Sequence, residues 1–248
     1  MKVFKKCARI IRKLHFVLCY FLLHHRKTIA KLSSYGLTDI RVYCVRHWYM
    51  GLGEEKLVRL FYKTKLDGTW CFVKLVENDS SIAKEIFINK YITERGIEFV
   101  PKLLLSDDNL LVIEFIQGMK KFKLPDDEKA FENMCADFKN IHACFKKFDI
   151  IHGDISASNV LLDKDNKIVL IDFGVGWVPG SEVFPSNHVI HHGTYYVESD
   201  NIRIYDNAFS FLRVLDYYKI PAKFKQMKCY KEIEQLVGAH CKELTIIE

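Results

Sequence analysis

Three polar residues between positions 151 and 174 have types and spacings that suit chemistry on a phosphate. Asp154 follows a His-Gly pair, Asn159 comes five residues later, and Asp172 opens an Asp-Phe-Gly thirteen residues after that. Carboxylate and amide oxygens are the hard ligands that Mg²⁺ takes where it bridges phosphate groups, and a further carboxylate can orient an attacking hydroxyl. The three residues therefore indicate metal-assisted transfer of a phosphoryl group.

The segment around these residues predicts a β-hairpin that brings them together. Residues 159–162 and 168–171 are short apolar runs on either side of the polar turn DKDNK, a pattern typical of two paired strands. Because a hairpin returns the chain on itself, all three polar side chains can converge at one of its ends. An ordinary turn-rich hairpin without chemistry would not need Asp, Asn and Asp at those positions.

The same segment resembles protein-kinase-like phosphotransferases in residue type and in both spacings. The resemblance implies that Asp154 orients or deprotonates an acceptor hydroxyl, while Asn159 and Asp172 hold Mg²⁺ beside ATP.

A lysine and a helix glutamate are expected to position the phosphates of ATP. Lys74 lies at the end of the strand sequence FVKLV, where the superfamily places the lysine that holds the α- and β-phosphates. Its glutamate partner comes from the following helix. Glu85 is the candidate and Glu94 is its rival.

The resemblance also implies a pocket for the nucleotide. Gly51 and Gly53 would cover the phosphates with their backbone amides, although the third glycine of such a loop is missing. The backbone carbonyl of Glu114 and the amide of Ile116 would meet the adenine edge, and Leu161 would form the apolar floor under the base.

Three departures separate the chain from ordinary protein kinases. Gly153 replaces the arginine before the catalytic aspartate, Ser156 stands where Ser/Thr protein kinases keep a lysine, and Phe72 takes the small-residue position over adenine. The HGD form without a lysine resembles small-molecule and atypical kinases instead. These are the aminoglycoside and choline phosphotransferases, the RIO kinases, the small KEOPS-complex kinase and the lipopolysaccharide core sugar kinases.

The predicted fold class is α+β, a two-lobed protein-kinase-like fold with an antiparallel N-lobe sheet and a shortened helical C-lobe. Strands are predicted over 41–48, 56–64, 69–76 and 110–116, and helices over 81–95 and 125–148. The predicted segments are a basic terminal helix (1–38), the N-lobe (39–117) and the C-lobe (118–248), with 39–248 as one kinase-like domain. We expect Asp206 to be a buried aspartate that ties the catalytic loop to the next helix.

Positive charge is concentrated at one end of the chain. Residues 1–38 hold nine Lys or Arg and no acid, which leaves 28 basic and 31 acidic residues elsewhere. Apolar residues recur there every three or four positions, but the longest apolar run, 16–23, is too short to span a bilayer. The segment predicts an amphipathic helix that either lies on an anionic membrane surface or packs on the N-lobe.

Two kinds of acceptor are compatible with the sequence. A short C-lobe, the HGD loop and the basic terminus favour a sugar hydroxyl of a lipopolysaccharide core or other envelope glycolipid. The alternative is a small atypical Ser/Thr protein kinase of the RIO or KEOPS type that works in a complex. No nucleic-acid partner is expected. The eight cysteines lack a C-x-x-C spacing, which favours reduced thiols in a cytoplasmic protein, either free or peripheral on the inner membrane.

Overall fold

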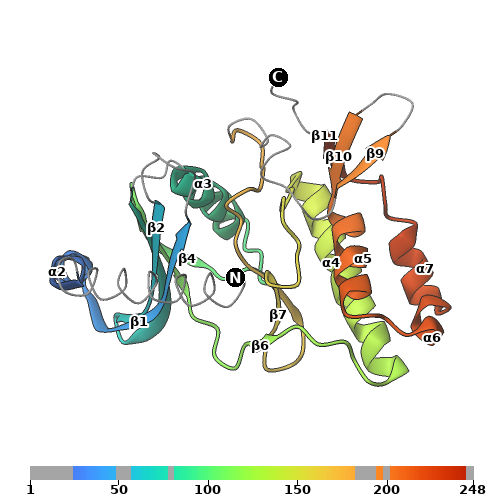
Figure 1. Cartoon of the computed structure of the whole chain (residues 1–248), viewed down its shortest axis with the longest axis horizontal. Coiled ribbons are helices and arrows are strands. Elements are labelled where there is room, and N and C mark those ends of the chain that lie inside the picture. The colour runs from blue at the N-terminus through green and yellow to red at the C-terminus, as the bar shows by residue number, and fades with distance from the viewer. Residues whose placement is uncertain (1–24, 49–56, 78–80, 182–193, 198–201, 244–248) are drawn as a thin grey trace, which may run out of the picture. The chain divides into compact units, whose positions relative to one another are not determined.

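The computed structural model describes residues 25–48, 57–77, 81–181, 194–197 and 202–243, and Figure 1 labels its elements. The strands are β1 (Leu37–Trp48), β2 (Leu57–Leu66), β3 (Thr69–Glu77), β4 (Leu103–Asp107), β5 (Leu110–Glu114), β6 (Lys120–Lys121), β7 (Val160–Leu162), β8 (Ile168–Leu170), β9 (Thr194–Val197), β10 (Ile202–Asp206) and β11 (Cys241–Glu243). The helices are α2 (His25–Ser34), α3 (Ser81–Glu94), α4 (Glu128–Phe148), α5 (Asn207–Tyr217), α6 (Ala222–Lys225) and α7 (Lys228–Glu234).

The strands form three sheets. The largest has the order β1-β2-β3-β5-β4, and the others have the orders β6-β7-β8 and β11-β10-β9. In the largest sheet β1, β2, β3 and β5 are paired antiparallel in that order. This mixture of helices with an antiparallel sheet confirms the predicted α+β class.

The chain divides into two compact units. The first takes its described residues from 1–79 and 109–115, and the second from 80–108 and 116–248. The predicted lobe boundaries stay a prediction.

A tight Asp-Gly turn fixes the register of the first unit's sheet. Asp67 and Gly68 both have positive φ, 49° and 80°, and Leu66 pairs with Thr69 across the turn. Positive φ at both central residues is what a type I′ hairpin turn requires, and this turn matches the twist of the flanking strands. The two turn residues therefore determine the β2–β3 hairpin without help from distant parts of the chain.

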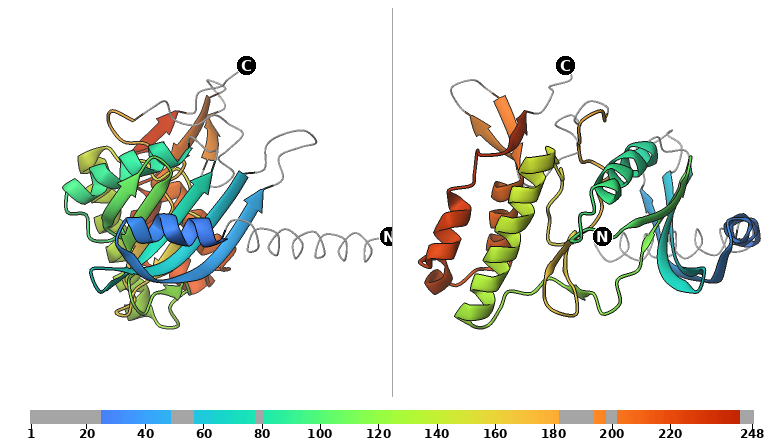
Figure 2. Two further views of the ribbon diagram at one scale, coloured as in Figure 1. Left: turned by 90° about the vertical axis from the view of Figure 1, so that its left-hand side faces the viewer. Right: turned by 180° about the vertical axis from the view of Figure 1, so that it is seen from behind.

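Helix α2 packs on the first unit, against one face of the sheet as Figure 2 shows. Its Leu32 is 0% exposed and its Thr28 is buried, while Lys31 Nζ donates to Asn109 Oδ1 at 2.7 Å. Within the basic terminal segment, residues 25–34 thus follow the packing alternative. Residues 1–24 lie outside the described part.

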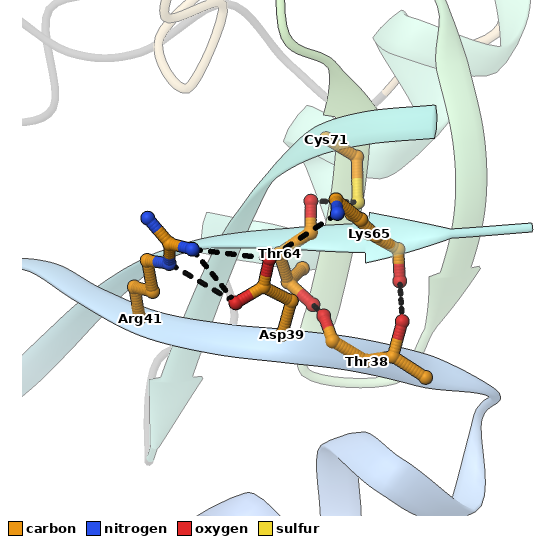
Figure 3. Close-up of polar contacts among 6 residues, drawn as sticks. All are labelled: Thr38, Asp39, Arg41, Thr64, Lys65 and Cys71. Atoms are coloured by element: carbon orange, nitrogen blue, oxygen red, sulfur yellow. Dashed lines mark hydrogen bonds and ion pairs between the residues drawn. The ribbon is translucent and has the colours of Figure 1, made fainter. Parts of the chain in front are cut away.

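Polar contacts also link β1 to β2, as the close-up in Figure 3 shows. Asp39, in a left-handed conformation (φ 51°) at a register shift of β1, accepts from Arg41 at 3.0 Å and pairs with Lys65 at 3.3 Å. The hydrogen bond from Arg41 is the main reason that the pKa of Asp39 lies below its ordinary value. Beside this network, Thr64 Oγ1 donates to the Thr38 carbonyl at 2.6 Å.

The second unit is organised around α4, the longest described helix. Asp127 caps its start by accepting from Ala130 N at 2.8 Å, and Asp149 ends it in a left-handed conformation with φ 49°. Its buried residues recur at helical spacing and face one core: Phe131, Met134, Cys135, Phe138, Ile141, His142 and Phe145.

Stacked aromatic rings join α4 to the helices that follow it. The rings of Phe138 and Phe211 lie 4.0 Å apart at an angle of 6°, and those of Phe131 and Phe224 lie 4.4 Å apart at 6°. Figure 1 shows α4, α5 and α7 side by side. No helix in the described part of the chain is long and apolar enough to cross a membrane.

Candidate functional site

The centre of the site is a hydrogen-bonded pair, Asp154 and Asn159. Asn159 Nδ2 donates to Asp154 Oδ2 at 2.8 Å and to the Asp154 carbonyl at 3.0 Å. Asn159 is buried whereas Asp154 is half-buried. Because its amide group is held by both contacts, Asn159 has a fixed orientation, and it fixes the Asp154 carboxylate in turn.

The β7–β8 hairpin brings the third polar residue to the same place. Ile171 N donates to the Asn159 carbonyl at 3.0 Å, so Asp172 directly follows a residue that is bonded to Asn159. At the far end, Asp163 Oδ1 accepts from the amides of Asp165 and Lys167 and closes the polar turn. The hairpin thus has the predicted bounds to within a residue.

The Asp-Phe-Gly segment is anchored by its aromatic ring. Asp172 has a φ of 68°, and Phe173, 1% exposed, packs with its ring centroid 4.3 Å from that of His152. Gly174 lies between two carboxylates, since a methyl group added to it would be 3.4 Å from both Asp172 Oδ1 and Glu85 Oε2.

The two candidate glutamates of α3 have different surroundings. Glu85 is 4% exposed and lies at the Asp-Phe-Gly segment, whereas Glu94 is exposed at the end of the helix. The structure thus favours Glu85 as the functional one. Its pairing with Lys74 stays a prediction.

His152 is a neutral, fully buried part of the loop. Burial lowers its pKa to about 4, and its Nδ1 accepts from Asp154 N at 3.3 Å. An acceptor Nδ1 requires the other ring nitrogen to carry the proton, and Nε2 has no hydrogen-bond partner in the described structure. The histidine therefore shapes the backbone at Asp154 and does not act as a cation.

Gly153 is required by a close backbone approach. Its φ is 82°, and a Cβ at this position would lie 2.3 Å from the carbonyl oxygen of Val175. No larger residue fits there without moving the backbone. The departure from an arginine at this position therefore has a structural cause, because the HGD loop packs directly on the segment after Asp-Phe-Gly.

The junction of β10 and α5 contacts the catalytic loop, the segment around Asp154. One expectation about this junction was wrong. Asp206 is buried as expected, but its carboxylate accepts from Phe209 N at 2.8 Å and Gly238 N at 2.6 Å, not from the catalytic loop. Its neighbour Asn207 makes the tie instead. Asn207 Oδ1 accepts from His152 N at 3.1 Å.

The first unit carries the lysine predicted to hold phosphates. Lys74 is 6% exposed on β3, opposite Phe61 on one side and Leu111 on the other. Phe72, on the same face of the strand, is packed by rings, with centroids 5.5 Å from Tyr43 and 5.6 Å from Phe61. Phe72, which stands where protein kinases keep a small residue over adenine, is therefore part of an aromatic cluster.

The remaining predicted nucleotide residues lie in different parts of the chain. Glu114 ends β5 and is half-buried, and the division into units falls between positions 115 and 116, just before Ile116. Leu161 is half-buried on β7, paired with Lys121 and Val169. The predicted loop of Gly51 and Gly53 lies outside the described residues.

The donors at this site suit a hard cation that is shared with a nucleotide. Asn159 offers Oδ1, which accepts from Ser158 Oγ at 3.3 Å, and Asp172 offers a carboxylate. Among the described residues no group of three His, Cys, Asp or Glu side chains is arranged to hold a metal ion alone. Phosphate oxygens would have to complete the ligands of any metal bound here.

Residues 74–176 match the family model of the RIO domain. The matched region is similar to the atypical small kinases of the protein-kinase-like superfamily. Dual specificity protein kinase zak2 of Dictyostelium discoideum is 30% identical over 114 residues, 40% of this chain and 18% of that protein. Serine/threonine-protein kinase CLA4 of Candida albicans is 31% identical over 140 residues, 50% of this chain and 14% of that protein.

A third relative aligns over more of the chain. Serine/threonine-protein kinase STY46 of Arabidopsis thaliana is 24% identical over 169 residues, 63% of this chain and 26% of that protein. The alignments thus span about a quarter or less of these three relatives' own lengths. Together with the RIO-domain match they place the region in a kinase domain, the type of phosphotransferase that binds ATP and uses a hydroxyl acceptor.

Proposed function

We propose that this chain transfers the γ-phosphate of ATP to a hydroxyl group with the help of Mg²⁺. The observation that carries the proposal is the Asp154–Asn159 pair, held at 2.8 Å beside the backbone of Asp172. Phosphoryl transfer needs a carboxylate to accept or orient the hydroxyl proton and oxygen ligands for the metal, all fixed before reaction.

Each residue has one role in this proposal. Asp154 orients the acceptor hydroxyl, and its carboxylate is steered by the Asn159 amide. Asn159 and Asp172 hold the metal, which supplies charge neutralisation at the phosphates when bound. Lys74 and Glu85 position the phosphates, as the superfamily's pattern suggests.

ATP turnover in two variants of the same hairpin tests the proposal. Asp172→Ala removes a metal ligand and should abolish the Mg²⁺-dependent turnover. Asp165→Ala alters an exposed residue of the β7–β8 turn and should leave turnover unchanged. If Asp172→Ala keeps wild-type turnover, Asp172 does not hold the catalytic metal.

For the acceptor, we propose a sugar hydroxyl of a lipopolysaccharide core or a related envelope glycolipid. Two features of the loop support it. The backbone packing at Gly153 leaves no room for the arginine through which a phosphorylated loop activates many protein kinases, and Ser156 replaces the lysine of Ser/Thr protein kinases. The basic residues of 1–38 would bring the protein to an anionic membrane surface.

A Ser/Thr protein acceptor is the second candidate, and the comparisons favour it. The matched family is the RIO domain, and relatives are named as serine/threonine or dual specificity kinases. In this case the chain works as a small atypical protein kinase within a complex.

An assay with ATP labelled in its γ-phosphate distinguishes the two proposals by identifying which molecule receives the phosphate. The protein is incubated with vesicles that contain envelope glycolipid and, in parallel, with a mixture of soluble proteins from the same cells. Incorporation into glycolipid that is lost in Asp154→Asn supports the first proposal. Incorporation into protein Ser or Thr alone would replace it with the second.

Vesicle sedimentation tests the membrane part of the proposal. The variant should lack residues 1–24 only, because α2 is part of the first unit's packing. Deletion of residues 1–24 removes six of the nine basic residues of the terminus. We expect this deletion to weaken binding to anionic vesicles, and we expect binding of the full chain to fall steeply with salt. Full vesicle binding by the truncated protein would contradict the role of this segment.

A further inference from the structure

Tyr205 is a buried tyrosine whose hydroxyl contacts the catalytic loop. Its side chain is 0% exposed, and its hydroxyl accepts from Ile155 N at 3.0 Å. Ile155 is the residue directly after Asp154 and is itself 1% exposed. Burial raises the pKa of Tyr205, so the phenol stays protonated and neutral around neutral pH.

The loop is held at both ends by one short segment. Tyr205 holds the amide after Asp154, while Asn207 accepts from His152 N at 3.1 Å and donates to the Ile150 carbonyl at 3.1 Å. Tyr205 and Asn207 are two positions apart, so both reach the loop while Asp206 between them bonds elsewhere.

Strand β11 pairs with β10 at Tyr205. Tyr205 pairs with Lys242 across β10 and β11, and Lys242 Nζ lies 3.3 Å from the ring centroid of Trp177. Trp177 in turn exchanges two backbone hydrogen bonds with Ile151, at 2.9 and 2.8 Å. The strand thus contacts two residues that are each bonded to the segment around Asp154.

We propose that Tyr205 is a positioning residue for Asp154, acting through the peptide that links Asp154 to Ile155. This inference rests on the proposed phosphotransfer. Removal of the phenol oxygen leaves the buried Ile155 N–H without its hydrogen-bond acceptor. We expect the backbone at Ile155 to shift until this N–H meets another acceptor. A small displacement of the carboxylate slows the chemical step because the reacting groups must be aligned.

The kinetic test uses Tyr205→Phe, which keeps the ring and removes only the hydroxyl. We expect kcat to fall about tenfold, with the KM for ATP within about twofold, since Tyr205 is not among the residues proposed to hold the nucleotide. Tyr230→Phe is the matched control, because Tyr230 is a buried tyrosine of α7 in the helical core. An unchanged kcat in Tyr205→Phe, or an equal fall in the control, would overturn the proposal.

Hydrogen exchange at the Ile155 amide tests the same contact without any acceptor. We expect this amide to exchange at least tenfold faster in Tyr205→Phe than in the full wild-type chain or in Tyr230→Phe, because its acceptor is gone. Unchanged protection would overturn the positioning role. If the wild type transfers no phosphate but the Ile155 amide exchanges faster in Tyr205→Phe, the proposed function is wrong. The hydrogen bond between Tyr205 and Ile155 is then still confirmed.

Discussion

The two units of the molecule hold their polar side chains in different ways. In the second unit a set of polar residues is buried around the catalytic loop: Glu85, His152, Asn159, Asp206 and Asn207. In the first unit the network of Figure 3 centres on Asp39 and Arg41, whose side chains are 34% and 64% exposed. One network is closed to water and the other is open to it.

This difference explains where a rigid site can be built. A buried hydrogen bond has no water to replace it, so its partners hold one arrangement, and losing one partner leaves the other unsatisfied. Exposed ion pairs are screened and readily exchanged for water. The comparison therefore predicts large effects for changes in the second unit and small effects for changes in the network of the first.

The largest effect is expected on phosphate transfer from a change in Asp154. Asp154→Asn keeps the size and the contact to Asn159 but removes the charge, so transfer should slow by roughly 10²–10⁴ with nucleotide affinity within a few-fold. Single-turnover transfer and nucleotide titration measure the two quantities. A large loss of nucleotide binding would mean that Asp154 has another role.

Two glycines with nearly the same φ sharpen the comparison directly. Gly153→Ala adds a Cβ 2.3 Å from a carbonyl oxygen, whereas Gly68→Ala meets nothing within 4 Å. In both variants the left-handed alanine should lower the free energy of unfolding by about 1 kcal/mol. The added clash in Gly153→Ala should bring its loss to about 3 kcal/mol or more. Denaturant unfolding of both variants measures this. Equal losses would show that the loop does not pack tightly on residue 175.

Acid should destabilise the second unit through its buried histidines. Burial lowers the pKa of His152 and of His142 to about 4, below the ordinary 6.5 of an unfolded chain. The unfolded state therefore binds more protons between these values, so stability is complete above about pH 6.5 and falls towards pH 4, by up to about 3 kcal/mol for each residue.

The variant His142→Gln tests this pH dependence away from the catalytic loop. We expect its free energy of unfolding to fall less between pH 7 and pH 5 than that of the wild type, because one titrating group is gone. An unchanged acid dependence would mean that His142 is not buried as a neutral side chain.

The smallest effect is expected in the exposed network. Asp39→Asn removes the partner of Arg41 and Lys65, and the melting temperature should change by no more than about 2 °C because the charges are screened. Differential scanning calorimetry at low and high salt measures it. A loss as large as that of Gly153→Ala would contradict the contrast between the two networks.

Much of the fold could be predicted because its signals are local. The Asp-Gly turn at 67–68 fixes one hairpin by its φ preference, and the polar turn around Asp163 fixes another by side-chain hydrogen bonds. Helix α4 follows from apolar residues at helical spacing and from Asp127 as its cap. Each of these features is complete within a few residues.

The supports of the site could not be predicted in the same way. Asp206 was predicted to tie the catalytic loop to the next helix, but its neighbours Tyr205 and Asn207 make this contact. Their side chains turn towards the loop, whereas that of Asp206 bonds to Gly238 N. No pattern of residue types distinguishes these neighbours. The backbone path of β10 into α5 decides it.

By itself, the sequence predicted the chemistry of this protein from Asp154, Asn159 and Asp172, at spacings that a hairpin brings together. It also predicted the similarity to protein-kinase-like enzymes that the RIO-domain match bears out. Only the tertiary structure decided how this chemistry is held. The contacts of the loop with Tyr205 and Asn207 join residues about fifty positions apart. Local spacing cannot encode such contacts, because they exist only after the second unit has packed and excluded water from both partners.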